Sequence, residues 1–140
     1  MEKVIDILLV EDDQLDAMDI QRTLDKMSIL YRLNLAKNGE EALDILHERK
    51  GGSLPDVTLI DINMPRMNGL EFLSIIRNKE EWKNMKCFVI TTSEERIDKE
   101  AAKNLGVSGY IIKPFKINNP SSIDSFNLMI DLMNMKGTSS

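Results

Sequence analysis

Short apolar runs recur along the chain and predict five β-strands. The runs cover residues 4–10, 29–36, 57–60, 87–90 and 107–112. The first run has no clear alternation of apolar and polar residues, which is typical of a strand buried on both faces. The second run does alternate, so we expect that strand to lie at an edge of the sheet.

Apolar residues at helical spacing follow the runs and predict five helices. The first four helices are expected to bury Ala17, Ile20, Leu24 and Met27; Ala42, Leu43 and Leu46; Leu70, Leu73 and Ile76; and Ile97, Ala101 and Leu105. Asp13 can cap the first helix, and Gly106 can end the fourth. Strands that alternate with helices predict an α/β fold, a parallel sheet covered on both faces by right-handed crossovers.

The last helix, of roughly fourteen residues, has two apolar faces. One stripe consists of Ile123, Phe126, Ile130 and Met133, and the other of Leu128, Leu132 and Met135. A helix that packs on one side of a sheet needs only one of them. The second set, Leu128, Leu132 and Met135, favours either a frayed terminus or a contact with a partner, including a second copy of the chain.

Composition excludes several function classes. The chain is 42% hydrophobic, so it can form a core, and its net charge of -5 argues against nucleic-acid binding, which needs a basic face. The one cysteine, Cys87, cannot form an internal disulfide and is expected to be a buried thiol, while His47 is expected to be exposed and without a role. We find no signal peptide and no apolar run near the ~20 residues that cross a membrane, so we expect no membrane contact and a cytoplasmic location.

Charged side chains stand where three of the predicted strands end. Glu11, Asp12 and Asp13 follow the first strand, Asp61 follows the third, and Lys113 follows the fifth. In open parallel sheets, ligands bind at the carboxyl ends of the strands. Carboxylate oxygens suit a hard cation such as Mg²⁺, and a lysine beside them suits a phosphoryl group.

Five short motifs of the sequence together resemble one protein family. The motifs are Glu11-Asp12, Asp61, Thr91, Lys113-Pro114 and the segment DINMPRMNGLE at residues 61–71. They resemble the receiver domain of bacterial two-component response regulators, especially the single-domain, chemotaxis-type members. The resemblance implies one receiver domain over 1–140, with a core at about 4–135 and no output domain. It also implies a flavodoxin-like (βα)5 fold, doubly wound, with the strand order 2-1-3-4-5.

The resemblance further implies a phosphoacceptor site. Asp61 would take a phosphoryl group from a sensor histidine kinase or a phosphotransfer protein. Mg²⁺, or Mn²⁺ in its place, would be bound by Asp12, Asp61 and the backbone carbonyl of Asn63. Glu11 would act through a water or by steadying the site, and whether it touches the ion is left open.

The remaining roles concern the phosphoryl group and the signal. Lys113 would pair with Asp61 and then with the phosphoryl oxygens, and Thr91 would donate its hydroxyl to them. Thr91 and Tyr110 would form a switch that changes the surface of the fourth helix, fifth strand and fifth helix toward a protein partner. Asn63 and Ser93 stand where the family tunes the lifetime of the acyl phosphate.

Other functions remain as alternatives. The same chemistry would serve a phosphorelay intermediate or a phosphate sink. An aspartyl phosphatase of the haloacid dehalogenase type is disfavoured, because Asn63 stands where the second aspartate would act as an acid. A flavin carrier is disfavoured because Glu11-Asp12-Asp13 would repel a phosphate. We therefore expect a signalling protein and not an enzyme, with only self-directed phosphotransfer and autodephosphorylation.

Overall fold

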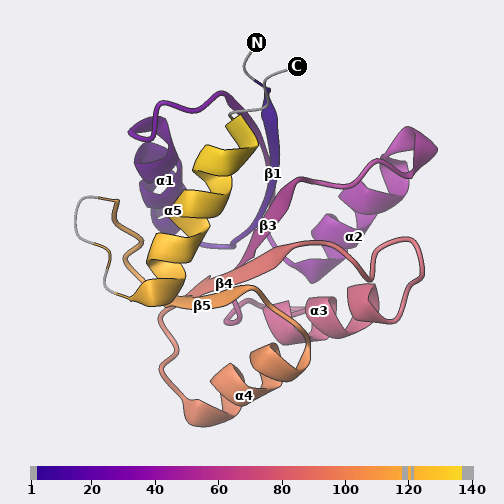
Figure 1. Cartoon of the computed structure of the whole chain (residues 1–140). Coiled ribbons are helices and arrows are strands. Elements are labelled where there is room, and N and C mark those ends of the chain that lie inside the picture. The colour runs from indigo at the N-terminus through magenta and orange to yellow at the C-terminus, as the bar shows by residue number, and fades with distance from the viewer. Residues whose placement is uncertain (1–2, 118–119, 121, 137–140) are drawn as a thin grey trace.

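Five parallel strands form one sheet at the centre of the molecule (Figure 1). The computed structural model describes residues 3–117, 120 and 122–136, so residues 1–2, 118–119, 121 and 137–140 of the expected domain lie outside it. The strands are β1 (Ile5–Val10), β2 (Tyr31–Ala36), β3 (Val57–Ile60), β4 (Cys87–Thr91) and β5 (Gly109–Ile112). Their order is β2-β1-β3-β4-β5, which confirms the predicted topology.

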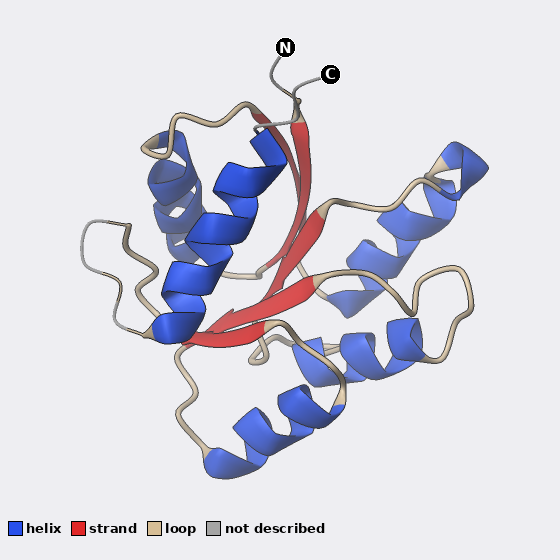
Figure 2. Ribbon diagram, in the orientation of Figure 1, coloured by secondary structure: helices blue, strands red, loops and turns tan. Residues whose placement is uncertain are grey.

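Helices cover both faces of this sheet (Figure 2). They are α1 (Gln14–Asp25), α2 (Gly39–Glu48), the short 3-10 helix η1 (Lys50–Gly52), α3 (Gly69–Arg77), α4 (Arg96–Asn104) and α5 (Ile123–Lys136). Helices α1 and α5 lie on one face, and α2, α3 and α4 on the other. Among the described residues, no helix has both the length and the apolar character to cross a membrane.

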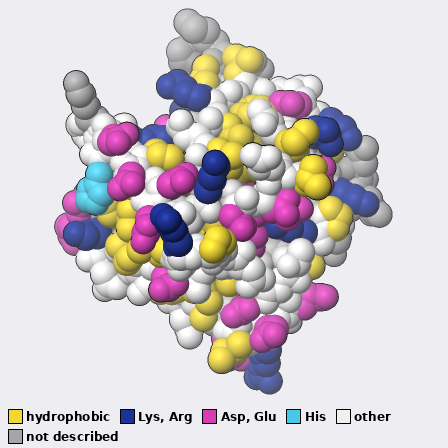
Figure 3. All heavy atoms as spheres, turned by 180° about the vertical axis from the view of Figure 1, so that it is seen from behind, with side chains coloured by type: hydrophobic (Ala, Val, Ile, Leu, Met, Phe, Trp, Pro, Cys, Tyr) yellow, Lys and Arg dark blue, Asp and Glu magenta, His cyan; other side chains and the backbone are white. Residues whose placement is uncertain are grey.

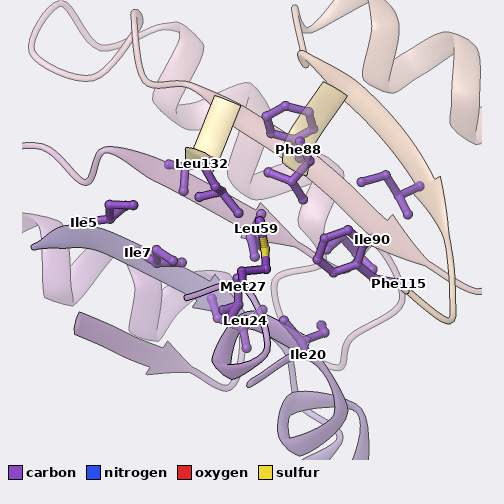
Figure 4. Close-up of a cluster of buried hydrophobic side chains, with 14 of the residues drawn as sticks. Ile5, Ile7, Ile20, Leu24, Met27, Leu59, Phe88, Ile90, Phe115 and Leu132 are labelled. Atoms are coloured by element: carbon purple, nitrogen blue, oxygen red, sulfur yellow. The ribbon is translucent and has the colours of Figure 1, made fainter. Parts of the chain in front are cut away.

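The core is divided by the sheet into two clusters. Ile5, Ile7 and Leu9 of β1 point to the side of α1 and α5, where they belong to one cluster with Leu24 of α1 (Figure 4 labels Ile5, Ile7 and Leu24). Leu8 and Val10 point to the other side. Both sets are buried because successive side chains of a strand face opposite ways, and helices cover each face.

The structure confirms the predicted helix cap, the predicted end of α4, the buried cysteine and the exposed histidine. Asp13 caps α1 by accepting a hydrogen bond from the N–H of Asp16, and Gly106 has a φ of +73° just after α4. Burial raises the pKa of the Cys87 thiol to about 11, so it stays protonated. His47 is exposed, with its ring edge against the buried Trp82.

The surface carries charges of both signs. On the face opposite to that of Figure 1, acidic and basic side chains are intermixed, with small groups of apolar side chains between them (Figure 3). This mixture differs from the continuous basic face that attracts phosphate backbones.

The expected assignment of the two faces of α5 is wrong. Leu128 and Leu132 are fully buried against the sheet, and Met135 packs on the same cluster. The stripe that faces solvent consists of Ile123, Phe126, Ile130 and Met133, which are 40–69% exposed. We name these four side chains the outer α5 stripe.

Two acidic contacts explain this orientation of α5. Asp124 accepts a hydrogen bond from the backbone N–H of Tyr110, at the open edge of β5 (2.9 Å), and Asp131 pairs with Lys86 (2.9 Å). These contacts turn toward the body of the protein the face that carries Leu128 and Leu132. Apolar spacing could not decide between the faces, because both are apolar.

A second expectation fails in α4. The apolar spacing predicts a buried Ile97, but this side chain is 71% exposed, and the one fully buried side chain of α4 is Ala102. Ala101 and Leu105 are only partly buried. Helix α4 therefore buries mainly small side chains, so its packing on the sheet is shallow.

Arg77, at the end of α3, joins three segments through backbone carbonyls. Its guanidinium donates to the oxygens of Leu105 (2.7 Å) and Gly106 (3.3 Å), after α4, and to those of Lys83 (3.0 Å) and Met85 (2.8 Å), before β4. The last carbonyls of a helix lack partners within the helix, so this arginine satisfies groups that would otherwise be left unpaired.

We predict that Arg77→Met lowers the free energy of unfolding by about 2 kcal/mol, because it leaves partly buried carbonyls without a donor. Denaturant unfolding measures the change. Arg22→Met is the matched control, since Arg22 makes one exposed ion pair, with Asp19, and should cost less than about 0.5 kcal/mol. Equal losses in the two variants would contradict this role of Arg77.

Candidate functional site

Three carboxylates meet where the strand order reverses, between β1 and β3. Val10 and Ile60 are register partners, so Glu11 and Asp12 leave the sheet beside Asp61. The N–H of Asp61 still donates to the oxygen of Val10 (2.9 Å), which fixes the position of the aspartate. One ligand oxygen from each carboxylate lies within 4.8 Å of those of the other two. Glu11 and Asp61 are buried, and Asp12 is exposed.

The ammonium of Lys113 lies among these carboxylates. Its Nζ is 2.7 Å from Oε1 of Glu11, 2.7 Å from Oδ2 of Asp16 and 3.1 Å from Oδ2 of Asp61. The backbone of Lys113 is held by its N–H, which donates to the oxygen of Thr91 at the end of β4 (2.8 Å). The structure thus brings together the predicted lysine and the predicted carboxylates.

Asp16 is a site residue that the sequence did not reveal. It lies in the first turn of α1, where an acidic residue is common because it complements the helix dipole. Its only sequence signal is its position three residues after the capping Asp13, which does not distinguish it from an ordinary first-turn acid.

The charges of the site are only partly balanced. Burial raises the pKa of Glu11 to about 7, although the adjacent Lys113 ammonium acts to lower it. Burial alone would lower the pKa of Lys113, but its contacts with the carboxylates of Asp16 and Glu11 and the charge of Asp61 raise it above the ordinary value. One ammonium therefore contacts three carboxylates, and Asp12 lies beside two of them, so the site has more acidic than basic groups.

This donor set fits a divalent cation. Carboxylate oxygens are the ligands that Mg²⁺ and Mn²⁺ prefer. Glu11 Oε2 accepts from the N–H of Asp13 (3.2 Å), whereas the buried Oε1 lies beside the Lys113 ammonium but accepts no well-aligned hydrogen bond from the described residues. Glu11 therefore offers an oxygen for an ion or for a water bound to one.

The loop after β3 approaches Asp61 closely. Asn63 donates its backbone N–H to Oδ1 of Asp61 (3.2 Å). A Cβ on Gly69 would lie 2.3 Å from the backbone oxygen of Asp61, so the chain can pass here only as glycine. Asn68 and Glu71 form a capping box that starts α3 directly after the loop. Gly69 and the capping box therefore fix the path of the loop close to Asp61.

Thr91, Ser93 and Tyr110 form a hydrogen-bonded group at the end of β4. Thr91 is fully buried, and its hydroxyl accepts from the N–H of Ser93 (3.3 Å). The half-buried Tyr110 donates its hydroxyl to the oxygen of Ser93 (2.9 Å), and the Ser93 hydroxyl donates to Asp98 of α4 (2.6 Å). Burial raises the pKa of the Tyr110 phenol, so it remains a donor.

Comparison with known proteins identifies the family of the chain. A model of the response regulator receiver domain matches residues 7–121. The probable methanogenesis regulatory protein FilR2 of Methanothrix harundinacea is 36% identical over 115 residues, which is 81% of this chain and 74% of that protein.

Solved structures agree with this match. A two-component response regulator from Legionella pneumophila is 34% identical, with a TM-score of 0.77, over 94% of this chain and 99% of the other. The Mn²⁺-bound form of the response regulator Rcp1 is 27% identical, with a TM-score of 0.74, over 95% of this chain and 96% of the other. By sequence, strand topology and the grouping of its strand-end residues, this chain belongs to the response regulator receiver domain family.

Proposed function

We propose that the chain is a cytoplasmic receiver that takes a phosphoryl group on Asp61 from a sensor histidine kinase or a phosphotransfer protein. The observation that carries this proposal is the position of the Asp61 carboxylate. It lies at the carboxyl edge of the sheet, 3.1 Å from the Lys113 ammonium and within reach of Glu11 and Asp12. A phosphorelay intermediate or a phosphate sink would use the same group.

The transfer makes one bond and breaks one. An oxygen of the Asp61 carboxylate bonds to phosphorus, and the phosphorus–nitrogen bond of the phosphohistidine breaks, its electron pair staying on the imidazole. Lys113 and the hydroxyl of Thr91 then donate to the phosphoryl oxygens. Positioning and charge neutralisation supply most of the rate in such a transfer, because little other covalent chemistry is needed.

A divalent cation fits the same proposal. Asp12, Asp61 and the backbone carbonyl of Asn63 would hold Mg²⁺, with Glu11 steadying it directly or through a water. The ion would supply positive charge against the carboxylate and phosphoryl oxygens. The excess negative charge around Lys113 supports this assignment.

A connected group of hydrogen bonds supports a switch at Thr91 and Tyr110. If Thr91 turns its hydroxyl toward a phosphoryl oxygen, its bond from the N–H of Ser93 is lost. Ser93 also contacts Tyr110 on β5 and Asp98 on α4, so its shift would favour a different arrangement of both. The α4–β5–α5 surface would then present the signal to a protein partner as a shift between two populations.

The outer α5 stripe supports a second copy of the chain as a partner. Its four members are spaced three, four and three residues apart, and this spacing reads the same in both directions. Two copies packed antiparallel about a two-fold axis therefore place Ile123 opposite Met133 of the partner subunit. They likewise place Phe126 opposite Ile130 of the partner subunit.

Charge does not oppose this pairing. Between residues 123 and 133 the charged side chains are Asp124 and Asp131, and both are bonded within their own chain. A stripe of four side chains buries less than the ~800 Å² per partner of a standard interface, so the dimer is expected to be weak.

The central proposal predicts phosphorylation at one residue. With Mg²⁺ and acetyl phosphate, wild-type protein should gain about 80 daltons in intact-mass spectra, and Asp61→Asn should gain nothing, because an amide cannot form the acyl phosphate. Asp44→Asn, at an exposed aspartate of α2, should behave as wild type. Equal labelling of the Asp61→Asn variant would overturn the proposal.

The switch predicts a local change at one of the two tyrosines of the chain. In fluorotyrosine-labelled protein, beryllofluoride with Mg²⁺ should shift the ¹⁹F signal of Tyr110 and leave that of Tyr31, which is bonded to Asp25 of α1 (2.5 Å), nearly unchanged. Tyr110→Phe assigns the two signals. Beryllofluoride binding without any movement of the Tyr110 signal would rule out this switch.

The dimer predicts a concentration-dependent mass in sedimentation equilibrium. Wild-type protein should move from monomer toward dimer as its concentration rises, while Phe126→Glu combined with Ile130→Glu should stay monomeric, because carboxylates would be buried against apolar side chains. Leu15→Glu, at an exposed leucine of α1, is the matched control and should still associate. A monomeric wild type at every concentration contradicts the pairing.

A further inference from the structure

Asp16 makes a contact that its place in α1 does not require. Its backbone N–H donates to the capping Asp13 (3.0 Å), as expected in the first turn of a helix. Its carboxylate, however, accepts from the ammonium of Lys113, which is 97 residues away in the sequence (2.7 Å). An acid that served only the helix dipole would need no such partner.

The contact completes the coordination of the ammonium. A lysine ammonium has three N–H donors, and here three carboxylates lie around it. Glu11 and Asp16 are each at 2.7 Å, and Asp61 is at 3.1 Å. The Glu11 side chain is 1% exposed and that of Asp16 is 36% exposed, so one holds the ammonium from the interior and the other from the solvent side.

Phosphorylation would change only one of these three contacts. Once Asp61 forms the acyl phosphate, its carboxyl group no longer carries a charge. The Lys113 donor that faced this carboxylate can then bond an oxygen of the attached phosphoryl group. The contacts to Glu11 and Asp16 can stay as they are. With its contacts to Glu11 and Asp16 unchanged, the Lys113 ammonium keeps its third N–H directed at the position of the phosphoryl group.

We propose that Asp16 is a positioning residue for phosphoryl transfer, which acts by holding the ammonium of Lys113 toward Asp61. This role rests on the proposed function of Asp61. Removing the carboxylate of Asp16 frees one donor of Lys113 and lets its ammonium move, so charge opposite the phosphoryl group is less well placed.

The test compares Asp16→Asn with Asp19→Asn. Asp19 is an acid one turn further along α1, with an exposed side chain that pairs with Arg22. Both variants remove one charge from the same helix, so a loss that comes only from helix stability or net charge would affect them similarly. Only Asp16 contacts Lys113 among these two.

The first readout is the ammonium signal of Lys113 in ¹⁵N spectra of the metal-free protein, assigned with Lys113→Arg. An ammonium held by three carboxylates exchanges its protons slowly and gives a resolved signal. We expect this signal in the wild type and in Asp19→Asn, and we expect it to be lost in Asp16→Asn. The second readout is the affinity for beryllofluoride with Mg²⁺, which should fall about tenfold in Asp16→Asn alone.

The two readouts separate the two proposals. An unchanged ammonium signal in Asp16→Asn, or an affinity for beryllofluoride that stays the same or increases, overturns the role of Asp16. If the wild type itself binds no beryllofluoride and takes no phosphoryl group, the proposed function fails, and the positioning role fails with it. The metal-free ammonium signal would then still decide whether Asp16 holds Lys113.

Discussion

The ammonium of Lys113 is the interaction on which the carboxyl edge of this sheet depends. It lies within 3.1 Å of carboxylates from the end of β1, from α1 and from the end of β3. A buried carboxylate without such a partner is strongly destabilising, so Glu11 and Asp61 can be buried because Lys113 offsets part of their charge. The offset is incomplete, and the remaining negative charge is what a divalent cation would neutralise.

The topology of the sheet brings these groups together. Because β1 and β3 are neighbours in register, the residues that follow them leave the sheet side by side, at the point where the strand order reverses. Lys113 reaches the same place from β5, its backbone held by the end of β4. The close approach of Gly69 to the backbone of Asp61 keeps the following loop near the site. The core thus fixes the positions of groups that would otherwise repel one another.

Much of the fold and the site could be predicted from the sequence, for physical reasons. Strands β1, β3 and β4 are almost completely buried, and such strands appear as apolar runs whose ends are easy to recognise. Glu11, Asp61 and Lys113 could be recognised because each is a charged residue that follows an apolar run, and a charge in that position points to a site at the edge of the sheet. The role of Thr91 is implied only by the resemblance to receiver domains, because a hydroxyl at the end of a strand is common.

The features that the sequence did not reveal depend on tertiary contacts. Asp16 looks like any acid in the first turn of a helix, and its partner Lys113 lies far away in the sequence. Arg77 donates to backbone carbonyls, which leave no trace in the residue types around it. The faces of α5 were reversed because both are apolar, and the contacts of Asp124 and Asp131 choose between them.

The dependence of stability on Mg²⁺ tests the account most directly. The free energy of unfolding of the wild type should rise when excess Mg²⁺ is added, because an ion that binds only the folded chain stabilises it. Asp12→Asn, which removes one oxygen ligand, should show a much smaller rise, and Asp44→Asn should match the wild type. A wild type that Mg²⁺ does not stabilise, or an equal rise in Asp12→Asn, would contradict the claim that this acidic edge is built for a divalent cation.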